Sequence, residues 1–173
     1  MRIKSLAVAS ALSLAALGAS AQIVVPWGAH DPGELGGTLF FGTGSSFPFE
    51  VIYTFSLANP QSLLAVGVTN DAAGVFDING ASVQLFLSNG NANFNDDLLL
   101  GSFAFDSTAV SQTFASIAPG SYFYKVSGQV DGPNGGSYLL SSALAPAVPE
   151  PGAAALLLAG LGALGSLRRR RAA

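Results

Sequence analysis

The sequence contains no cysteine and a single histidine, His30. Without cysteine the chain can form neither a disulfide nor a thiolate nucleophile, and one histidine cannot supply the ligands of a zinc site. A serine nucleophile needs a neighbouring base, and the Gly-x-Ser-x-Gly turn that presents such a serine in many hydrolases is absent. No spacing marks out a glycosidase pair among the ten carboxylates. We therefore expect a protein that is not an enzyme.

Basic residues are also scarce, and they are unevenly placed. Six of the seven lie close to the two ends of the sequence, so that residues 22–150 contain one lysine, Lys125, against ten carboxylates and carry a net charge of −9. Binding to phosphate backbones requires clustered Lys and Arg side chains. The charge distribution therefore excludes a nucleic-acid partner.

The first 21 residues have the three parts of a secretory signal peptide. Arg2 and Lys4 precede an apolar run at 5–18, and Ala19-Ser20-Ala21 supplies the small residues that signal peptidase recognises. A buried core helix would instead show caps and one polar face, which this stretch lacks. We expect cleavage after Ala21 and a mature chain that begins at Gln22.

The last 27 residues form a second targeting pattern. Pro149-Glu150-Pro151 precedes an uncharged apolar run at 153–167, which is followed by Arg168, Arg169, Arg170 and Arg171. As a helix, this run reaches roughly 23–26 Å, somewhat less than the roughly 30 Å core of a bilayer. The arginines would remain in the cytoplasm, so the preceding body would lie outside. A marginal transmembrane helix is expected, and a permanent tail anchor remains an alternative.

This arrangement resembles the PEP-CTERM sorting signal, which combines a Pro-Glu-Pro motif, a short hydrophobic helix and a terminal arginine cluster. The resemblance implies that residues 147–173 are recognised and cut by exosortase, a membrane-embedded transpeptidase of Gram-negative bacteria. It further implies an exported protein that is anchored transiently in the inner membrane before release to the cell surface, the extracellular matrix or a biofilm.

Residues 22–146 are predicted to form an all-β body. Residues 49–57 alternate, with Val51, Tyr53, Phe55 and Leu57 on one side, as in a half-buried strand. Gly-, Pro- and Asn-containing segments at 88–90, 118–120 and 132–136 are typical of turns. This spacing favours an antiparallel β-sandwich or jelly roll. The expected strands lie at 37–41, 49–57, 63–69, 82–88, 98–105, 110–114, 121–130 and 137–144.

Two stretches of the body are similar to the FxDxF family of PEP-CTERM proteins. Residues 117–128, followed by Gly136-Ser137-Tyr138, resemble its C-terminal hairpin, and residues 49–53 fall where its naming motif would lie. Val51 replaces the aspartate of that motif and Tyr53 replaces its second phenylalanine. The family carries no established enzymatic activity.

One loop carries oxygen ligands at alternate positions, as a calcium site would. The EF-hand pattern fails, because the glycine and the bidentate glutamate that it requires are missing, and asparagine and aspartate are also common in plain hairpin loops. No other cofactor is expected. The candidate calcium ligands are Asn91, Asn93, Asn95 and Asp97. We also expect His30 and Asp31 to form a surface turn pair and Lys125 to point to solvent.

Two classes of function follow from these patterns. The first is a structural or interaction component of the extracellular matrix, with an acidic β surface. The second is a secreted carbohydrate-binding module, which could contact exopolysaccharide by stacking Tyr122, Tyr124 or Tyr138 on sugar rings. Cross-strand packing is the alternative role for these tyrosines.

Overall fold

The computed structural model describes residues 22–42, 45–71, 75–91 and 93–146. The predicted signal peptide with Ala19 and Ala21, and the predicted sorting signal at 147–173, lie outside these residues. Among the described residues there is no helix that could cross a membrane. The strands are β1 (Ile23–Ala29), β2 (Gly33–Phe41), β3 (Phe47–Leu57), β4 (Gln61–Asn70), β5 (Ile78–Leu87), β6 (Leu98–Ala104), β7 (Val110–Ile117), β8 (Gly120–Val130) and β9 (Gly135–Pro146).

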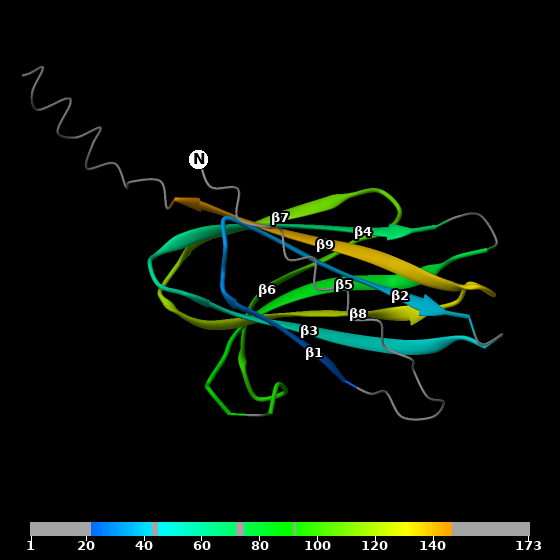
Figure 1. The fold of residues 1–173 in the computed structure, drawn as a ribbon, viewed down its shortest axis with the longest axis horizontal. Helices are drawn as coiled ribbons and strands as arrows, with labels where there is room; N and C mark the ends of the chain where they lie inside the picture. The colour runs from blue at the N-terminus through cyan, green and yellow to red at the C-terminus, as the bar shows by residue number, and fades with distance from the viewer. Residues whose placement is uncertain (1–21, 43–44, 72–74, 92, 147–173) are drawn as a thin grey trace, which may run out of the picture.

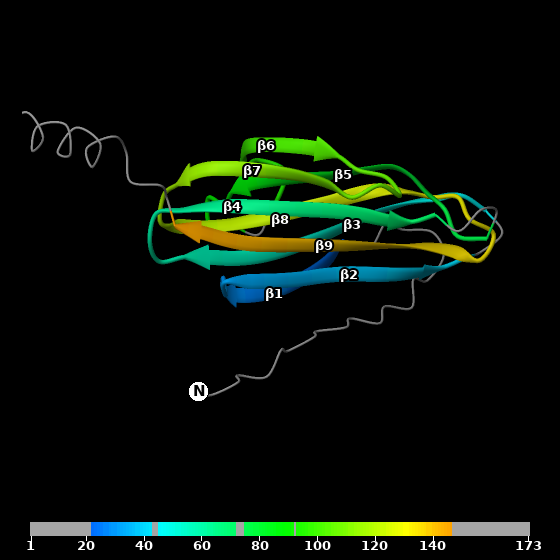
Figure 2. The ribbon, with the colours of Figure 1, turned by 90° about the horizontal axis from the view of Figure 1, so that it is seen from above.

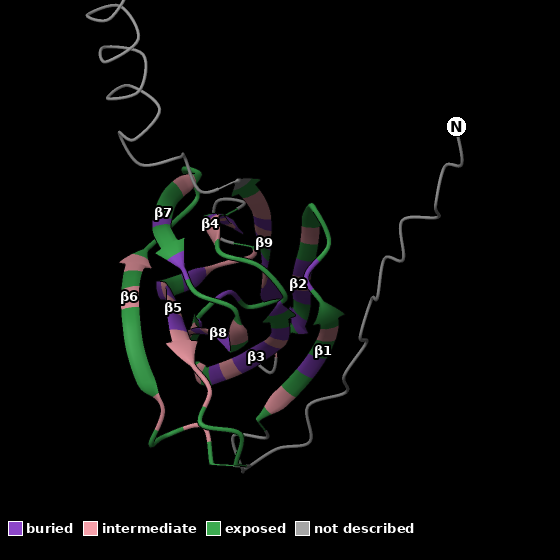
Figure 3. Cartoon of the chain, turned by 90° about the vertical axis from the view of Figure 1, so that its left-hand side faces the viewer, coloured by how far each residue is buried: buried purple, intermediate pink, exposed green. Residues whose placement is uncertain are grey.

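The strands form two sheets that pack face to face and run along the long axis of the molecule (Figures 1 and 2). One sheet has the order β1-β3-β8-β5-β6 and the other the order β2-β9-β4-β7. Figure 3, which views the sandwich from one end, shows these orders as two layers. All pairings are antiparallel except that of β1 with β3. The predicted all-β sandwich is therefore confirmed.

The connections alternate between the two sheets with one exception. Every consecutive pair of strands has one member in each sheet, except β5 and β6, which are neighbours in the five-stranded sheet. The connection from β5 to β6 is therefore the one link between described strands that begins and ends on the same sheet.

All eight predicted strands are present, mostly with an extra residue or more at their ends, whereas β1 was not predicted. Pro26 lies in the middle of β1 and interrupts the sequence pattern of a strand, because proline has no N–H to donate to a neighbour. The structure accommodates it at the edge of the sheet, where β1 pairs with β3 alone. A register shift follows between Pro26 and Gly28, and Gly28 has a φ of 81°.

Aromatic rings fill much of the space between the sheets, and three glycines make room for them. A Cβ on Gly36 of β2 would overlap the Tyr53 ring, lying 2.7 Å from its Cζ. A Cβ on Gly67 of β4 would lie 2.7 Å from Cγ of Phe105, and one on Gly101 of β6 would lie 2.9 Å from the Phe114 ring. Since real Cβ atoms essentially never approach so closely, these strand positions require glycine.

We predict that Gly36→Ala destabilises the 22–146 segment by about 1–3 kcal/mol, because the new methyl group overpacks the core. Gly33→Ala is the matched control in the same strand, since a Cβ there meets nothing within 4 Å. It should change the free energy of unfolding by no more than about 0.5 kcal/mol. Urea unfolding of both variants measures the difference, and equal stabilities would contradict this account of the core.

Candidate functional site

The loop between β5 and β6 covers part of the outer face of the five-stranded sheet. Phe94 of this loop packs edge-on against Phe123 of β8 with ring centroids 5.0 Å apart, and Phe123 stacks on Phe86 of β5 at 4.9 Å. Phe123 is completely buried although it does not belong to the core cluster between the sheets. The loop thus creates a small second apolar cluster on this face. Figure 3 shows the loop below the five-stranded sheet.

Lys125, the one lysine of the body, lies beside this cluster rather than free in solvent. Its side chain is 12% exposed and its Nζ lies 3.5 Å from Oε2 of Glu50 and 5.5 Å from the centroid of the Phe86 ring. It also donates to Oδ1 of Asn95 at 3.5 Å. The prediction that Lys125 points to solvent is therefore wrong, because the loop folds over the strand that carries it.

The predicted calcium ligands all lie in this loop, where their side chains accept hydrogen bonds from the protein. Oδ1 of Asn91 accepts the backbone N–H of Asn93 at 2.6 Å, and Oδ1 of Asn93 accepts that of Asn95 at 3.3 Å. Oδ1 of Asp97 accepts the backbone N–H of Asn89 at 2.6 Å. The first two contacts are successive Asx turns, and the contact of Asp97 with Asn89 joins the two ends of the loop.

The carboxylate of Asp96 closes the same loop. It accepts hydrogen bonds from the side-chain amides of Asn91 and Asn89, which lower the pKa of Asp96. Oδ2 of Asp97 is buried and has no hydrogen-bond partner among the described residues. Within those residues no three His, Cys, Asp or Glu side chains gather around one point. Calcium binding at Asn91, Asn93, Asn95 and Asp97 stays a prediction.

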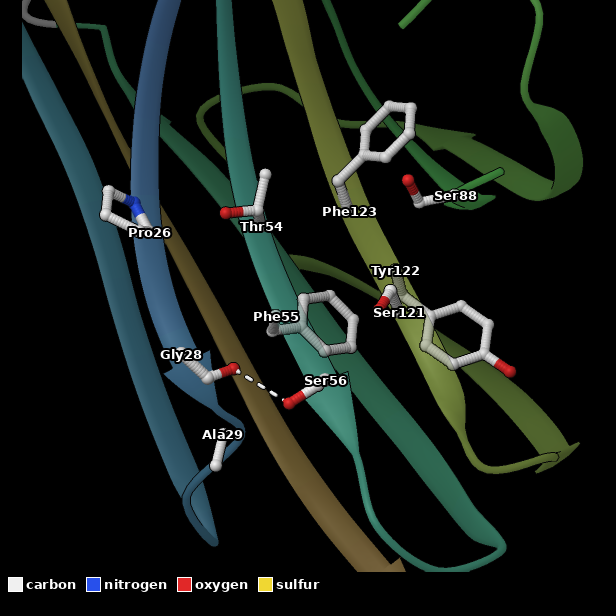
Figure 4. Close-up of a pocket in the computed structure, with 10 residues that line it drawn as sticks. All are labelled: Pro26, Gly28, Ala29, Thr54, Phe55, Ser56, Ser88, Ser121, Tyr122 and Phe123. Carbon is white, nitrogen blue, oxygen red and sulfur yellow. Dashed lines mark hydrogen bonds between the residues drawn. The ribbon is translucent and has the colours of Figure 1, made fainter. Parts of the chain in front are cut away.

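A shallow hollow of about 390 Å³ lies on the outer face of the five-stranded sheet, near the end of β1. Figure 4 shows that its lining comes mainly from β1, β3 and β8. No lining residue is charged, and four of them bear aliphatic hydroxyl groups: Thr54, Ser56, Ser88 and Ser121. The hollow can therefore offer hydrogen bonds to a neutral polar group, but it contains no base that titrates near neutral pH.

The three tyrosines predicted as a sugar-stacking surface do not form one. Tyr122, Tyr124 and Tyr138 are at most 4% exposed and belong to the core, so the predicted stacking surface is wrong and cross-strand packing is confirmed. The hydroxyl of Tyr122 donates to the carbonyl of Ala118 at 2.7 Å. Burial raises the pKa of all three phenols, so they remain protonated.

His30 is buried rather than part of a surface turn pair, and it completes a hydrogen-bonded chain across the two sheets. Its Nδ1 lies 2.5 Å from the carbonyl oxygen of Asp31, which requires a proton on that nitrogen. Its Nε2 lies 2.9 Å from Oγ of Ser142 on β9, and the hydroxyl of Tyr124 on β8 lies 3.0 Å from the same Oγ. Neutral His30 therefore accepts from Ser142, which accepts from Tyr124.

The contact between His30 and Ser142 brings a serine next to a base, an arrangement that sequence reasoning missed. Ser142 and His30 are 112 positions apart, and only the fold brings them together. Ser142 is completely buried, so its Oγ has no access to a substrate. The pair therefore serves to satisfy buried polar groups, and no sequence signal distinguished Ser142 from the other serines of β9.

We predict that the folded body loses stability on acidification because of His30. Burial lowers the pKa of His30 below its ordinary value of 6.5, and this outweighs the opposing influence of Asp31 and Glu34. The unfolded state therefore takes up the proton more readily, so that stability is greatest above about pH 6.5 and falls as the pH decreases from there. Protonation of Nε2 would also remove the acceptor of Ser142.

Urea midpoints at about pH 7.5 and 5.5 measure this effect, because most carboxylates titrate below this range. His30→Gln is the control, which should be less stable overall but should lose the His30-dependent step between the two values. A step of equal size in both proteins would contradict the assignment to His30.

Comparisons with known proteins identify the motif in the C-terminal tail. No curated protein sequence matches the chain. Similar solved structures include the pre-peptidase C-terminal domain of a collagenase from Bacillus anthracis, at 16% identity and a TM-score of 0.44 over 70% of this chain and 95% of that one. Another is PliG of Aeromonas hydrophila, a periplasmic inhibitor of g-type lysozyme, at 15% identity and a TM-score of 0.41 over 72% of this chain and all of that one. Both TM-scores lie below 0.5, and the similarity is limited to the β-sheet fold.

The sorting signal itself is recognised directly. Residues 147–171 match the family described as the PEP-CTERM protein-sorting motif, which includes Pro149, Glu150, Pro151 and the four arginines at 168–171. The FxDxF subfamily stays a prediction, since the match covers the tail alone. The motif implies an exported chain that exosortase processes as a substrate. The chain therefore carries a PEP-CTERM protein-sorting motif at residues 147–171.

Proposed function

We propose that this protein is a non-enzymatic component of the cell surface or extracellular matrix of a Gram-negative bacterium, delivered by cleavage of its tail. The observation that carries the proposal is the sorting motif at 147–171, which begins directly after β9 ends at Pro146. The sandwich is then the part that exosortase releases, and signal peptidase removes residues 1–21 at the other end.

The chemistry of the sandwich supports a role without catalysis. The one histidine is held in a buried hydrogen-bonded chain, and its serine partner has no access to solvent. The one lysine of the body pairs with Glu50 and contacts Asn95. His30, Ser142 and Lys125, which would be candidates for a base or a nucleophile, are therefore committed to structural contacts.

A secreted carbohydrate-binding module is the second candidate, and the hollow on the five-stranded sheet favours it. Thr54, Ser56, Ser88 and Ser121 present hydroxyl groups around an uncharged space of about 390 Å³. Neutral sugars offer hydroxyl groups that such a surface could bind, although the buried tyrosines remove the stacking surface that many sugar sites use.

Sorting is tested by exchanging the arginine cluster in the full chain. We expect replacement of Arg168 to Arg171 by glutamine to leave uncleaved precursor in the membrane, because the positive charges that hold the end of the tail in the cytoplasm are lost. Replacement of the same four residues by lysine preserves the charge and is the matched control. Immunoblots of membrane and external fractions measure the two forms.

Pro149→Ala combined with Pro151→Ala tests the motif without changing the charge, and it should also block release. A shortened protein that still reaches the outside in normal amounts in both the glutamine and the alanine variants would refute the sorting assignment. Release by the lysine variant but not by the glutamine variant would support it.

Carbohydrate binding is tested at the hollow with native gels that contain the exopolysaccharide of the host. We expect retardation of the released protein if the hollow binds sugar, and Thr54→Val with Ser121→Ala should abolish it by removing two hydroxyl groups. Ser102→Ala, an exposed serine on β6, is the control. Equal migration of all three proteins with and without polysaccharide would contradict this second function.

A further inference from the structure

The outer face of the four-stranded sheet is apolar and exposed. Its largest side chains are Leu35, Leu39 and Phe41 of β2, Leu64 of β4 and Leu139 of β9, which are 38–57% exposed. The register places Leu139 at the centre, directly opposite Gly37 on β2 and Val68 on β4. We call these five exposed residues, together with the half-buried Val66 and Val68, the apolar face.

The apolar face carries no charge. The remaining outward positions of its strands are serine, threonine, alanine, glycine and asparagine. The acidic side chains of the described residues lie in turns, on the five-stranded sheet or, for Glu34, on the inward row of β2. The negative charge of the body therefore lies away from this face. The face has no acidic residue that could attract a cationic partner and no basic residue that could attract an anionic partner.

The strand connections explain why the two outer faces differ. The loop between β5 and β6 begins and ends on the five-stranded sheet, and it folds over the outer face of that sheet with Phe94. Each of the other connections crosses between the sheets. Within the described chain, the four-stranded sheet therefore has no connection of its own that could fold back over its leucines.

We propose that the apolar face binds the same face of a second copy of this chain, about a two-fold axis close to Leu139. Two sheets that present apolar rows pack readily at about 10 Å, which is how the two sheets of one copy already meet. An isologous contact sets an uncharged surface against an uncharged surface and keeps the acidic turns of both copies at its periphery. Phe41, the most exposed of the large side chains on the face, supplies an aromatic anchor.

A lipid surface fits these observations less well than a second copy. The one lysine of residues 22–146, Lys125, lies on β8 of the other sheet, so the apolar face offers no attraction to anionic headgroups. The face also lacks the basic rim with which peripheral proteins hold a membrane. The contact between copies goes beyond the proposed function and does not depend on sorting or on matrix binding.

The absence of cysteine allows a direct test in the full chain. Leu139→Cys introduces the sole thiol, and a bismaleimide whose two ends span about 10 Å should link two copies if the axis lies close to this position, because packed sheets lie about 10 Å apart. Ser102→Cys, exposed on the β6 edge, is the control for random collision. We expect the linked fraction to be at least about tenfold higher for Leu139→Cys.

A second substitution in the Leu139→Cys protein tests the chemistry of the contact. Leu39→Glu would bury a carboxylate in the interface and should reduce the linked fraction by at least about tenfold. Leu98→Glu makes the same change at an exposed leucine of β6, outside the apolar face, and should leave the linked fraction unchanged. Circular dichroism of each protein verifies that the sandwich remains folded.

Several outcomes would overturn the proposal. Equal linking at Leu139→Cys and Ser102→Cys would mean that the copies meet at random. Linking that Leu39→Glu leaves intact would place the contact elsewhere. Co-sedimentation with vesicles of phosphatidylglycerol that Leu39→Glu abolishes, without linking at Leu139→Cys, would assign the face to a membrane. Secretion and tail cleavage are recorded in the same cultures, so failure of sorting is distinguished from failure of the contact.

Discussion

The close approach of the two sheets depends on glycines that stand where any larger residue would meet an aromatic ring. Gly36 faces Tyr53, Gly67 faces Phe105, and Gly101 faces Phe114 across the interior. Glycine normally weakens a strand, because it contributes no side chain and loses much backbone freedom on folding. Here the packing of the aromatic rings into the space above each glycine offsets this loss of stability. A glycine-rich chain can therefore form a packed core.

Buried hydroxyl groups then hold the sheets in register in a protein that has no disulfide. The hydroxyls of Tyr53 on β3 and Tyr138 on β9 lie 2.8 Å apart, and Tyr124 on β8 shares Ser142 on β9 with His30. The Tyr53–Tyr138 and Tyr124–Ser142 contacts join the five-stranded sheet to the four-stranded sheet, and His30 contributes from the connection between β1 and β2. Because a slip by one residue would turn these side chains to the other face of their sheet and separate the pairs, the pairs favour one register of the sandwich.

The fold was largely predictable, whereas the arrangement of its polar groups was not. Period-two alternation is a local signal, which is why the strand around Val51, Tyr53 and Phe55 was found from the sequence. The edge strand β1 was missed, since Pro26 is incompatible with a central strand and a sequence does not state which strand lies at an edge.

His30 and Lys125 were assigned wrongly for a related reason. Their burial depends on contacts across the fold, with Ser142 for the histidine and with Glu50 and Asn95 for the lysine. Local sequence shows the residue type but not the distant segment that covers it. The sorting signal, in contrast, is read from contiguous residues and was recognised from the sequence alone.

The sequence of β4 predicts a strand that is buried on both faces, whereas one copy of the sandwich buries only one of them. Residues 63–68 read Leu-Leu-Ala-Val-Gly-Val, and such a continuous apolar run is typical of a strand that is buried on both faces. In the described structure Leu63 is fully buried on the inner face while Leu64 is 38% exposed on the outer face. A solvated outer face would favour alternating polar residues, as on Glu50, Thr54 and Ser56 of β3. The pattern of β4 is therefore that of a strand whose second face is also covered.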